Sequence, residues 1–142
     1  MSQARITILG TAQDAGLPQL GCLCAACERA RREPAYRRLP AAVALTASTG
    51  RTMLVDATWA LTEQSALLAR SPARPLGFDA VLLTHAHADH IHGIDDVRPY
   101  VIEHGRLLPV YMDAATSGVS ALEMASRGIF GARALETVLP ST

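Results

Sequence analysis

The sequence predicts one mixed α/β domain. Three observations support this: segments with strand character come first, helical segments separate the later ones, and an early pair of strands has a β-hairpin pattern. The chain has 142 residues, of which 49% are hydrophobic, and this suits one domain with a buried core. No change in composition marks a boundary, so we expect a single domain over residues 1–142.

The first half of the chain predicts a strand, a loop, a helix and a hairpin. The segment ARITILG alternates up to Gly10 and predicts the opening strand, and the Gly- and Pro-rich residues after it predict a loop. Helix-forming residues then continue until Pro34. The dipeptide Thr49-Gly50 predicts the hairpin turn, and the second hairpin strand ends at Asp56. The predicted ranges are 4–10 (strand), 11–22 (loop), 25–33 (helix), and 41–48 and 51–56 (hairpin strands).

The second half predicts alternating helices and strands. Residues 58–70 predict a helix that the segment SPARPLG ends, and the continuous apolar run at 78–84 predicts a buried strand. Another strand is predicted at 106–112, weakened by Pro109, and a further helix at 114–127. From residue 128 the pattern fades and predicts no further element.

Composition excludes several classes of partner. The formal net charge is zero, so we expect neither a nucleic-acid partner nor a membrane partner. The N-terminus does not have the pattern of a signal peptide, and no apolar run is long enough to span a bilayer, so we expect a soluble cytoplasmic protein. The arginines between residues 29 and 38 indicate a solvated surface, with a phosphate contact as the less favoured alternative. The sequence leaves the oligomeric state open.

Four side chains in the segment THAHADHIHGIDD form the first candidate site. The spacing H-x-H-x-D-H cannot lie on one helix face, but it fits a loop that leaves a strand and lets side chains converge. Imidazole and carboxylate are ligands for zinc, manganese and iron. We therefore predict metal binding by His85, His87, Asp89 and His90, whereas His92, Asp95, Asp96 and His104 are interpreted as bystanders.

Three cysteines form the second candidate site. Cys22, Cys24 and Cys27 have the spacing C-x-C-x-x-C, which can hold three corners of a tetrahedral zinc ion. The alternative is three unconnected buried thiols, which is disfavoured because the cluster follows a Gly-rich loop and begins a helix. An odd number of clustered cysteines also suits metal binding in a reducing compartment better than disulfides.

The motif LLTHAHADH resembles the signature of the metallo-β-lactamase superfamily of metallohydrolases. The resemblance implies an αββα sandwich in which His85 and His87 bind a first metal ion and Asp89 and His90 a second. It also implies a position for Asp56 close to the metals, and we expect Asp56 to orient a ligand histidine; a simple strand-end cap is the alternative. Asp89 and Asp56 are accordingly the candidate catalytic residues.

Together with the cysteine segment, the same motif is similar to the phosphoribosyl cyclic phosphate phosphodiesterase branch of that superfamily. In that branch the cysteines form a structural zinc site with a histidine from the C-terminal part. The opening GTAQDAGLPQ also resembles the pyrroloquinoline-quinone biosynthesis protein B group. The resemblance covers only the N-terminal half of a family member, whose second half brings the remaining ligands. We therefore expect an incomplete domain with one open sheet face, half-liganded metal sites and poor activity by itself.

The sequence thus predicts a metal-dependent hydrolase with two divalent ions, zinc or manganese, and one structural zinc. The expected reaction is attack of a metal-bound hydroxide on a small cyclic phosphodiester. The alternative is a non-catalytic, truncated metal-binding fragment or an accessory protein of the pyrroloquinoline-quinone biosynthesis protein B type. The substrate, the identity of the metal and the source of the missing ligands are not determined by these residues.

Overall fold

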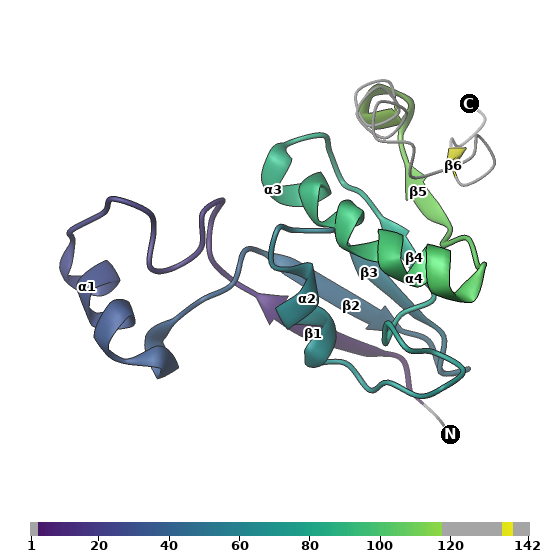
Figure 1. The fold of residues 1–142 in the computed structure, drawn as a ribbon, viewed down its shortest axis with the longest axis horizontal. Helices are drawn as coiled ribbons and strands as arrows, with labels where there is room; N and C mark the ends of the chain where they lie inside the picture. Colours follow the sequence, from purple (N-terminus) through teal and green to yellow (C-terminus); the bar gives the residue numbers. More distant parts are fainter. Residues whose placement is uncertain (1–2, 118–134, 138–142) are drawn as a thin grey trace.

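A mixed β-sheet forms the centre of the computed structural model, which describes residues 3–117 and 135–137 (Figure 1). Six strands lie in chain order across the sheet within the described residues. The first three strands pair antiparallel and the remaining pairs are parallel. The strands are β1 (Arg5–Gly10), β2 (Ala42–Thr46), β3 (Thr52–Val55), β4 (Ala80–Leu82), β5 (Val110–Met112) and β6 (Leu135–Thr137).

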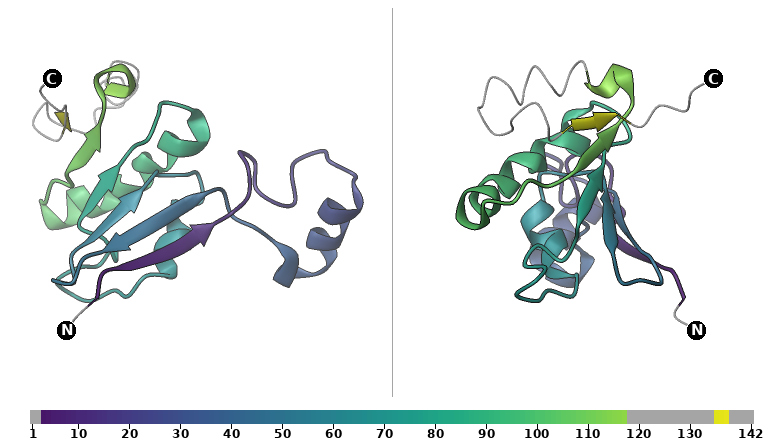
Figure 2. Two further views of the ribbon diagram at one scale, coloured as in Figure 1. Left: turned by 180° about the vertical axis from the view of Figure 1, so that it is seen from behind. Right: turned by 90° about the vertical axis from the view of Figure 1, so that its right-hand side faces the viewer.

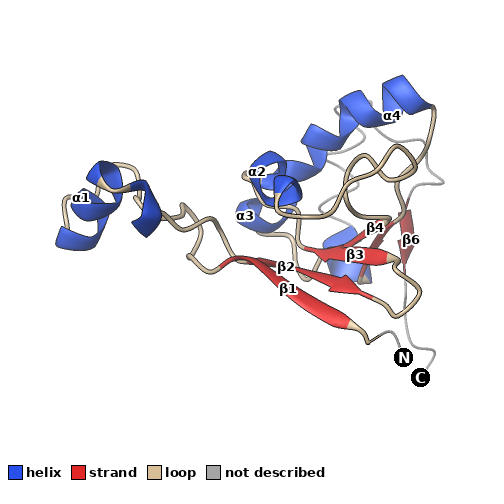
Figure 3. Cartoon of the chain, turned by 90° about the horizontal axis from the view of Figure 1, so that it is seen from below, coloured by secondary structure: helices blue, strands red, loops and turns tan. Residues whose placement is uncertain are grey.

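The helices α2, α3 and α4 lie on one face of the sheet, and α1 stands apart from it. Figure 3 shows α2, α3 and α4 on the same side of the strands, and Figure 1 shows α1 at the end of an arm that projects from the sheet. No helix in the described part of the chain is long and apolar enough to cross a membrane. The helical elements are α1 (Ala25–Arg32), α2 (Leu61–Ala66), α3 (Ala88–Ile91), α4 (Arg98–His104) and the 3₁₀ helices η1 (Pro34–Tyr36) and η2 (His92–Val97).

The predicted hairpin is confirmed. The strands β2 and β3 pair antiparallel with Ala44 opposite Leu54, and Gly50 takes a φ of 85° in the connecting turn. This left-handed conformation is one that glycine adopts without steric cost. The opening strand pairs with the hairpin in turn, with Ile6 opposite Leu45, so the three antiparallel strands form one side of the sheet.

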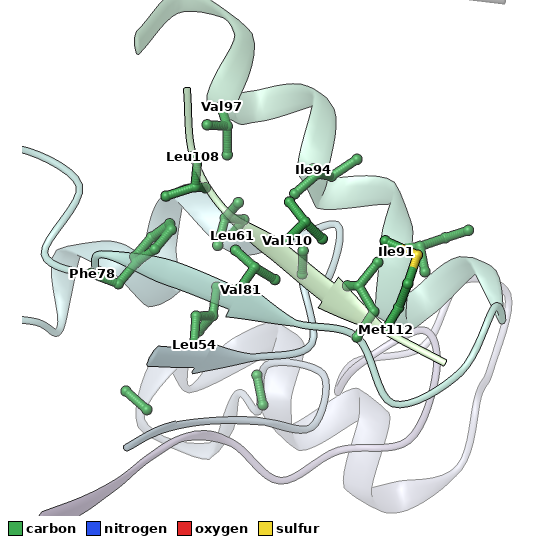
Figure 4. Close-up of a cluster of buried hydrophobic side chains, with 14 of the residues drawn as sticks. Leu54, Leu61, Phe78, Val81, Ile91, Ile94, Val97, Leu108, Val110 and Met112 are labelled. Carbon is green, nitrogen blue, oxygen red and sulfur yellow. The ribbon is translucent and has the colours of Figure 1, made fainter. Parts of the chain in front are cut away.

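The hydrophobic core lies between the sheet and the helices. Leu54, Val81 and Val110 come from neighbouring strands and are fully buried on the helix side. Leu61 of α2 and Ile94 of η2 cover them from the helix layer (Figure 4). Each strand therefore points alternate residues into this core and the intervening residues to the opposite face.

In the part of the chain that the structure describes, the opposite face of the sheet carries exposed apolar side chains, as expected for half of a sandwich. Ile6 and Ile8 are 70% and 65% exposed, and Leu45 beside them is also exposed. A groove of about 680 Å³ runs over this face. Ile6, Leu45, Met53, Ala80 and Tyr111 are among its lining residues. Figure 2 shows the molecule from behind and from its right-hand side, with α2, α3 and α4 on the other side of the sheet.

Several elements differ from the prediction. The predicted helix 58–70 is reduced to α2, and before it the backbone N–H of Ala60 donates to the Thr58 hydroxyl at 3.1 Å. The strand β6, which no sequence pattern predicted, pairs parallel with β5. Of the predicted helix 114–127, residues 114–117 are helical. Asp113 precedes them, and its carboxylate accepts a hydrogen bond from the backbone N–H of Thr116 at 2.7 Å. The rest of that helix lies outside the described residues.

Candidate metal centre

The candidate site lies where two neighbouring parallel strands end. The strands β3 and β4 pair in parallel, so their carboxyl ends meet at one edge of the sheet. Asp56 follows β3 directly, and the histidine loop follows β4 before α3 begins at Ala88. Backbone hydrogen bonds join the two loops: the N–H of Ala57 donates to the carbonyl oxygen of His90 at 2.8 Å. Sequence segments about thirty residues apart thus form one site.

The four predicted ligands converge in pairs. The ring centroids of His85 and His87 lie 4.5 Å apart, and those of His85 and His90 lie 4.0 Å apart. The carboxylate Oδ2 of Asp89 lies 3.2 Å from Nε2 of His90. This arrangement suits two ions that each take two ligands from this loop. The assignment of these four side chains to two separate ions stays a prediction.

Asp56 lies behind these ligands with its side chain almost completely buried. The residue is 6% exposed and has a φ of 65°. A left-handed aspartate costs on the order of 1–3 kcal/mol, so the surrounding structure must hold it there. Its Oδ1 accepts hydrogen bonds from both the backbone N–H and the hydroxyl of Thr84, each at 2.8 Å.

These contacts place Asp56 behind two imidazoles at once. Oδ2 of Asp56 lies 2.8 Å from Nδ1 of His90, and the Thr84 hydroxyl lies 2.9 Å from Nδ1 of His85. When the hydroxyl donates to Asp56, it accepts a hydrogen bond from His85, so Nδ1 of His85 carries the hydrogen. The same tautomer at His90 puts a hydrogen on Nδ1, 2.8 Å from Oδ2 of Asp56. Both Nε2 atoms are then left for metal coordination.

The residues at this site have the chemistry to bind divalent ions, and His90 provides the main structural evidence. Its Nδ1 is fully buried and makes no hydrogen bond of acceptable direction within the described chain, although the Asp56 carboxylate is only 2.8 Å away. Rotation of the ring would be needed to bring its N–H into line with that carboxylate. An ion on Nε2 would fix the ring in that position, because coordination sets the ring's orientation.

A hollow of about 600 Å³ opens beside this cluster. His87, Asp89 and His90 line it from one side, and Gln13 and Asp14 from another. The latter two belong to the loop after β1 and were not among the predicted site residues. The only sequence signal for them was the Gly- and Pro-rich composition of that loop.

The cysteine cluster forms a separate site on the projecting arm. One ligand atom from each of Cys22, Cys24 and Cys27 lies within 4.8 Å of the others, which is close enough to hold one ion. Cys24 is the N-cap residue of α1, and Cys27 is buried in its first turn. The predicted convergence is confirmed, and Figure 1 shows α1 far from the histidine loop at α3.

Two of the thiols differ in acidity. The backbone N–H of Cys27 and the thiols of Cys22 and Cys27 lower the pKa of Cys24 to about 7. At Cys27 the backbone N–H of Gln19 acts to lower the pKa, but burial and the two neighbouring sulfurs outweigh it, and the pKa is raised. Cys24 therefore ionises more readily than Cys27 and offers a thiolate to a metal at lower pH.

The residues interpreted as bystanders are exposed or partly exposed. His92 is exposed at the start of η2, and Asp96 is exposed and accepts a hydrogen bond from the Thr62 hydroxyl at 3.3 Å. His104 is exposed at the end of α4, with its ring 4.9 Å from that of Tyr100. The arginines between residues 29 and 38 were predicted to lie on a solvated surface. Arg29 agrees with this, because its half-exposed side chain pairs with the half-exposed Glu33 at 3.3 Å.

Comparison with known proteins identifies the family. A family model described as "Beta-lactamase superfamily domain" matches residues 51–129, which is more than half of the chain. The chain belongs to the β-lactamase superfamily. The matched stretch contains Asp56 and the whole histidine loop, so the candidate metal centre lies within the part that defines membership.

Solved structures of the superfamily share the fold. A diphosphatase from the PhnP family matches with a TM-score of 0.73 and 31% identity over 96% of this chain and 50% of that chain. Zn²⁺-bound PqqB from Methylobacterium extorquens matches with a TM-score of 0.73 and 22% identity over 94% of this chain and 44% of that chain. The fold is therefore that of the metallo-β-lactamase proteins, in the form of about half of such a domain.

The curated proteins to which this chain is similar are considerably longer than this chain. The coenzyme PQQ synthesis protein B of Cupriavidus taiwanensis is 34% identical over 116 residues, covering 78% of this chain and 37% of that protein. A protein of Porphyromonas gingivalis named octanoyltransferase is 34% identical over 94 residues, covering 66% of this chain and 18% of that protein. This chain thus spans well under half the length of these two relatives.

Proposed function

We propose that this chain carries one half of a dinuclear metal-dependent hydrolase site that acts on a small phosphodiester. The observation that carries the proposal is the convergence of four metal-binding side chains in front of one buried carboxylate, Asp56. The 31% identity with a diphosphatase of the PhnP family supports cleavage of a phosphorus–oxygen bond. The zinc-bound PqqB structure supports a divalent metal.

The residues have distinct roles in this proposal. His85 and His87 would hold a first ion, and Asp89 and His90 a second. Divalent ions at such a site supply Lewis acidity and an activated water. Asp56 lies next to Nδ1 of His90 and reaches Nδ1 of His85 through the Thr84 hydroxyl, so it is placed to orient both rings. Because Asp56 is buried, water cannot compete for these contacts.

Two ligands per ion are too few for a tight site. We propose that a second half-domain, in the same polypeptide or in another, supplies the remaining ligands and covers the open apolar face. The diphosphatase structure, of which this chain spans 50%, supports such an arrangement. At the cysteine site, a fourth ligand from the same source would complete a structural zinc centre. Its reduced thiols suit a cytoplasmic location.

The direct test combines metal analysis with an assay on bis(p-nitrophenyl) phosphate in the presence of Mn²⁺ or Zn²⁺. We expect Asp89→Ala to weaken Mn²⁺ binding and to abolish turnover, which is already slow in the 142-residue chain. The matched control is Asp96→Ala, which removes an exposed carboxylate from the same segment and should leave both unchanged. Mn²⁺ affinity that is unchanged in Asp89→Ala would contradict the proposed centre.

A second candidate is a cofactor-biosynthesis role without hydrolysis. The 34% identity with a coenzyme PQQ synthesis protein B favours it. Under this alternative, the histidine loop binds metal but the phosphodiester is not cleaved, even when a completing half-domain is supplied. Turnover that requires Asp89 would exclude it.

A further inference from the structure

The turn from Gln13 to Gly16 is anchored on both sides. At its base the backbone N–H of Ala12 donates to the carbonyl oxygen of Leu39 at 2.9 Å. On the far side Leu17 and Arg38 exchange two backbone hydrogen bonds, each at 2.9 Å. Within the turn the N–H of Gly16 donates to the carbonyl oxygen of Gln13 at 2.8 Å. The tip that lines the hollow, Gln13 and Asp14, therefore projects from a closed loop.

One side chain reaches this tip from the metal-site side. The indole Nε1 of Trp59 donates a hydrogen bond to the carbonyl oxygen of Asp14 at 3.0 Å, across 45 residues of sequence. The ring also packs against Gly16, where an added Cβ would lie 3.2 Å from an indole carbon. Trp59 is 49% exposed, so hydrophobic burial alone does not explain its position.

The backbone that carries Trp59 is itself fixed to the metal site. Three residues earlier in the chain, Asp56 contacts His90. The intervening Thr58 is fully buried, and its hydroxyl donates to Gln64 at 2.8 Å. The segment 56–59 therefore connects Asp56, which contacts His90, with Trp59, which contacts Asp14. This short connection sets the distance between the candidate metal ligands and the Gln13–Gly16 turn.

We propose that Trp59 is a positioning residue that holds the Gln13–Gly16 turn as a fixed wall of the pocket, and that this wall contacts the bound ligand. The inference rests on the proposed function, because it presumes that the hollow beside the histidines receives a phosphoryl ligand. The inference gives a role to Trp59, Gln13 and Asp14, which lie outside the metal-binding motif. Trp59 is not one of the proposed metal ligands, so we expect its removal to weaken ligand binding and to leave metal binding intact.

The chain contains a single tryptophan, so its fluorescence reports directly on this contact. We expect the emission of the 142-residue chain to change when Mn²⁺-loaded protein is titrated with phenyl phosphate, a product-like monoester. Mn²⁺ is chosen because cysteine thiolates prefer zinc. Binding measured by calorimetry without a change in emission would show that the wall does not sense the ligand and would overturn the inference.

Two variants test the positioning role by calorimetry. Trp59→Phe removes the donor and keeps a ring, and Gly16→Ala displaces the turn while the indole remains. We expect both to weaken phenyl phosphate binding about three- to tenfold, the loss of one hydrogen bond, with Mn²⁺ affinity within about twofold of the unmodified chain. Amide exchange of residues 11–17 should be faster in both. The control Leu67→Ala removes an exposed side chain just past α2 and should change none of these values.

The outcomes separate the inference from the proposed function. Phenyl phosphate affinity unchanged in Trp59→Phe overturns the positioning role, and so does a metal-loaded chain that does not bind phenyl phosphate. Failure of the unmodified chain to bind Mn²⁺, or unchanged Mn²⁺ binding in Asp89→Asn, overturns the proposed metal centre instead.

Discussion

The carboxylate of Asp56 lies 2.8 Å from Nδ1 of His90, and it is held there in a left-handed backbone conformation. Asp56 follows one strand of the sheet and His90 follows its parallel neighbour, so the contact depends on the pairing of β3 with β4. Holding a buried carboxylate in a strained backbone conformation costs free energy. Strain of this kind is concentrated at functional sites. We take this contact as the support on which the metal ligands rest.

The first prediction concerns Asp56→Asn. The amide keeps the size of the side chain and an acceptor for the Thr84 N–H, but it lacks the negative charge beside His90. We expect Mn²⁺ affinity to fall about ten- to a hundredfold, the usual cost of losing such an orienting partner. Calorimetry on Asp96→Asn provides the control. Unchanged affinity in Asp56→Asn, with native circular dichroism, would favour the alternative that Asp56 only caps the strand.

The second prediction concerns Gly93, which lies at the end of the histidine segment. A Cβ built on Gly93 would lie 1.8 Å from the carbonyl oxygen of Thr58, and the Gly93 N–H donates to Ala57 at 2.9 Å. We expect Gly93→Ala to lower the free energy of unfolding by about 1–3 kcal/mol, because the added atom must push two loops apart.

Gly105→Ala is the matched comparison for Gly93→Ala. An added Cβ there meets open space, although φ is 59°. Its cost should therefore arise from the backbone conformation alone, on the order of 1 kcal/mol. Denaturant titrations of the two variants provide the measurement. A Gly93→Ala protein as stable as the unmodified chain would show that the loops separate without cost.

The third prediction concerns the acidity of the cysteines in metal-free protein. Because the pKa of Cys24 is lowered to about 7 and that of Cys27 is raised, Cys24 is the more fully ionised of the two at neutral pH. Thiolates are the species that react with iodoacetamide. We expect Cys24 to be alkylated first, at a rate that rises as pH increases through about 7 and then levels off, as measured by peptide mass spectrometry.

Zinc provides the control for that experiment. An ion held by all three sulfurs would protect Cys24 from alkylation at every pH in the series. Equal reactivity of Cys24 and Cys27 in the metal-free chain would contradict the assigned difference in acidity.

The fourth prediction concerns the open sheet face. The isolated chain should bind a hydrophobic dye such as anilinonaphthalene sulfonate and should self-associate, because apolar side chains cover this face. Ile8→Lys should reduce both effects while changing the free energy of unfolding by no more than about 0.5 kcal/mol, since Ile8 is already 65% exposed. Leu23→Lys, an exposed change on the arm, is the control. Dye binding that persists in Ile8→Lys and disappears in Leu23→Lys would show that the dye binds to the arm and not to the sheet face.

Local sequence patterns were sufficient for the hairpin, the buried strand before the histidine loop and the two clusters of metal-binding side chains. Each of these depends on interactions within a few residues: a glycine that accepts a left-handed turn, an apolar run, or ligands spaced closely on one loop. The spacing of Cys22, Cys24 and Cys27 alone placed their sulfurs together, because a short turn leads directly into α1.

The sequence by itself thus determined that this protein has a mixed α/β fold with four candidate ligands after a buried strand. The tertiary structure alone decided which residues surround them. Asp56 meets His90 because two strands pair in parallel, and Trp59 reaches Asp14 because the loop after β1 folds back over the end of the sheet. The strand β6 likewise exists by pairing with β5, without a local pattern of its own. Such contacts join distant segments, and their energy lies in packing and hydrogen bonds that no short stretch of sequence contains.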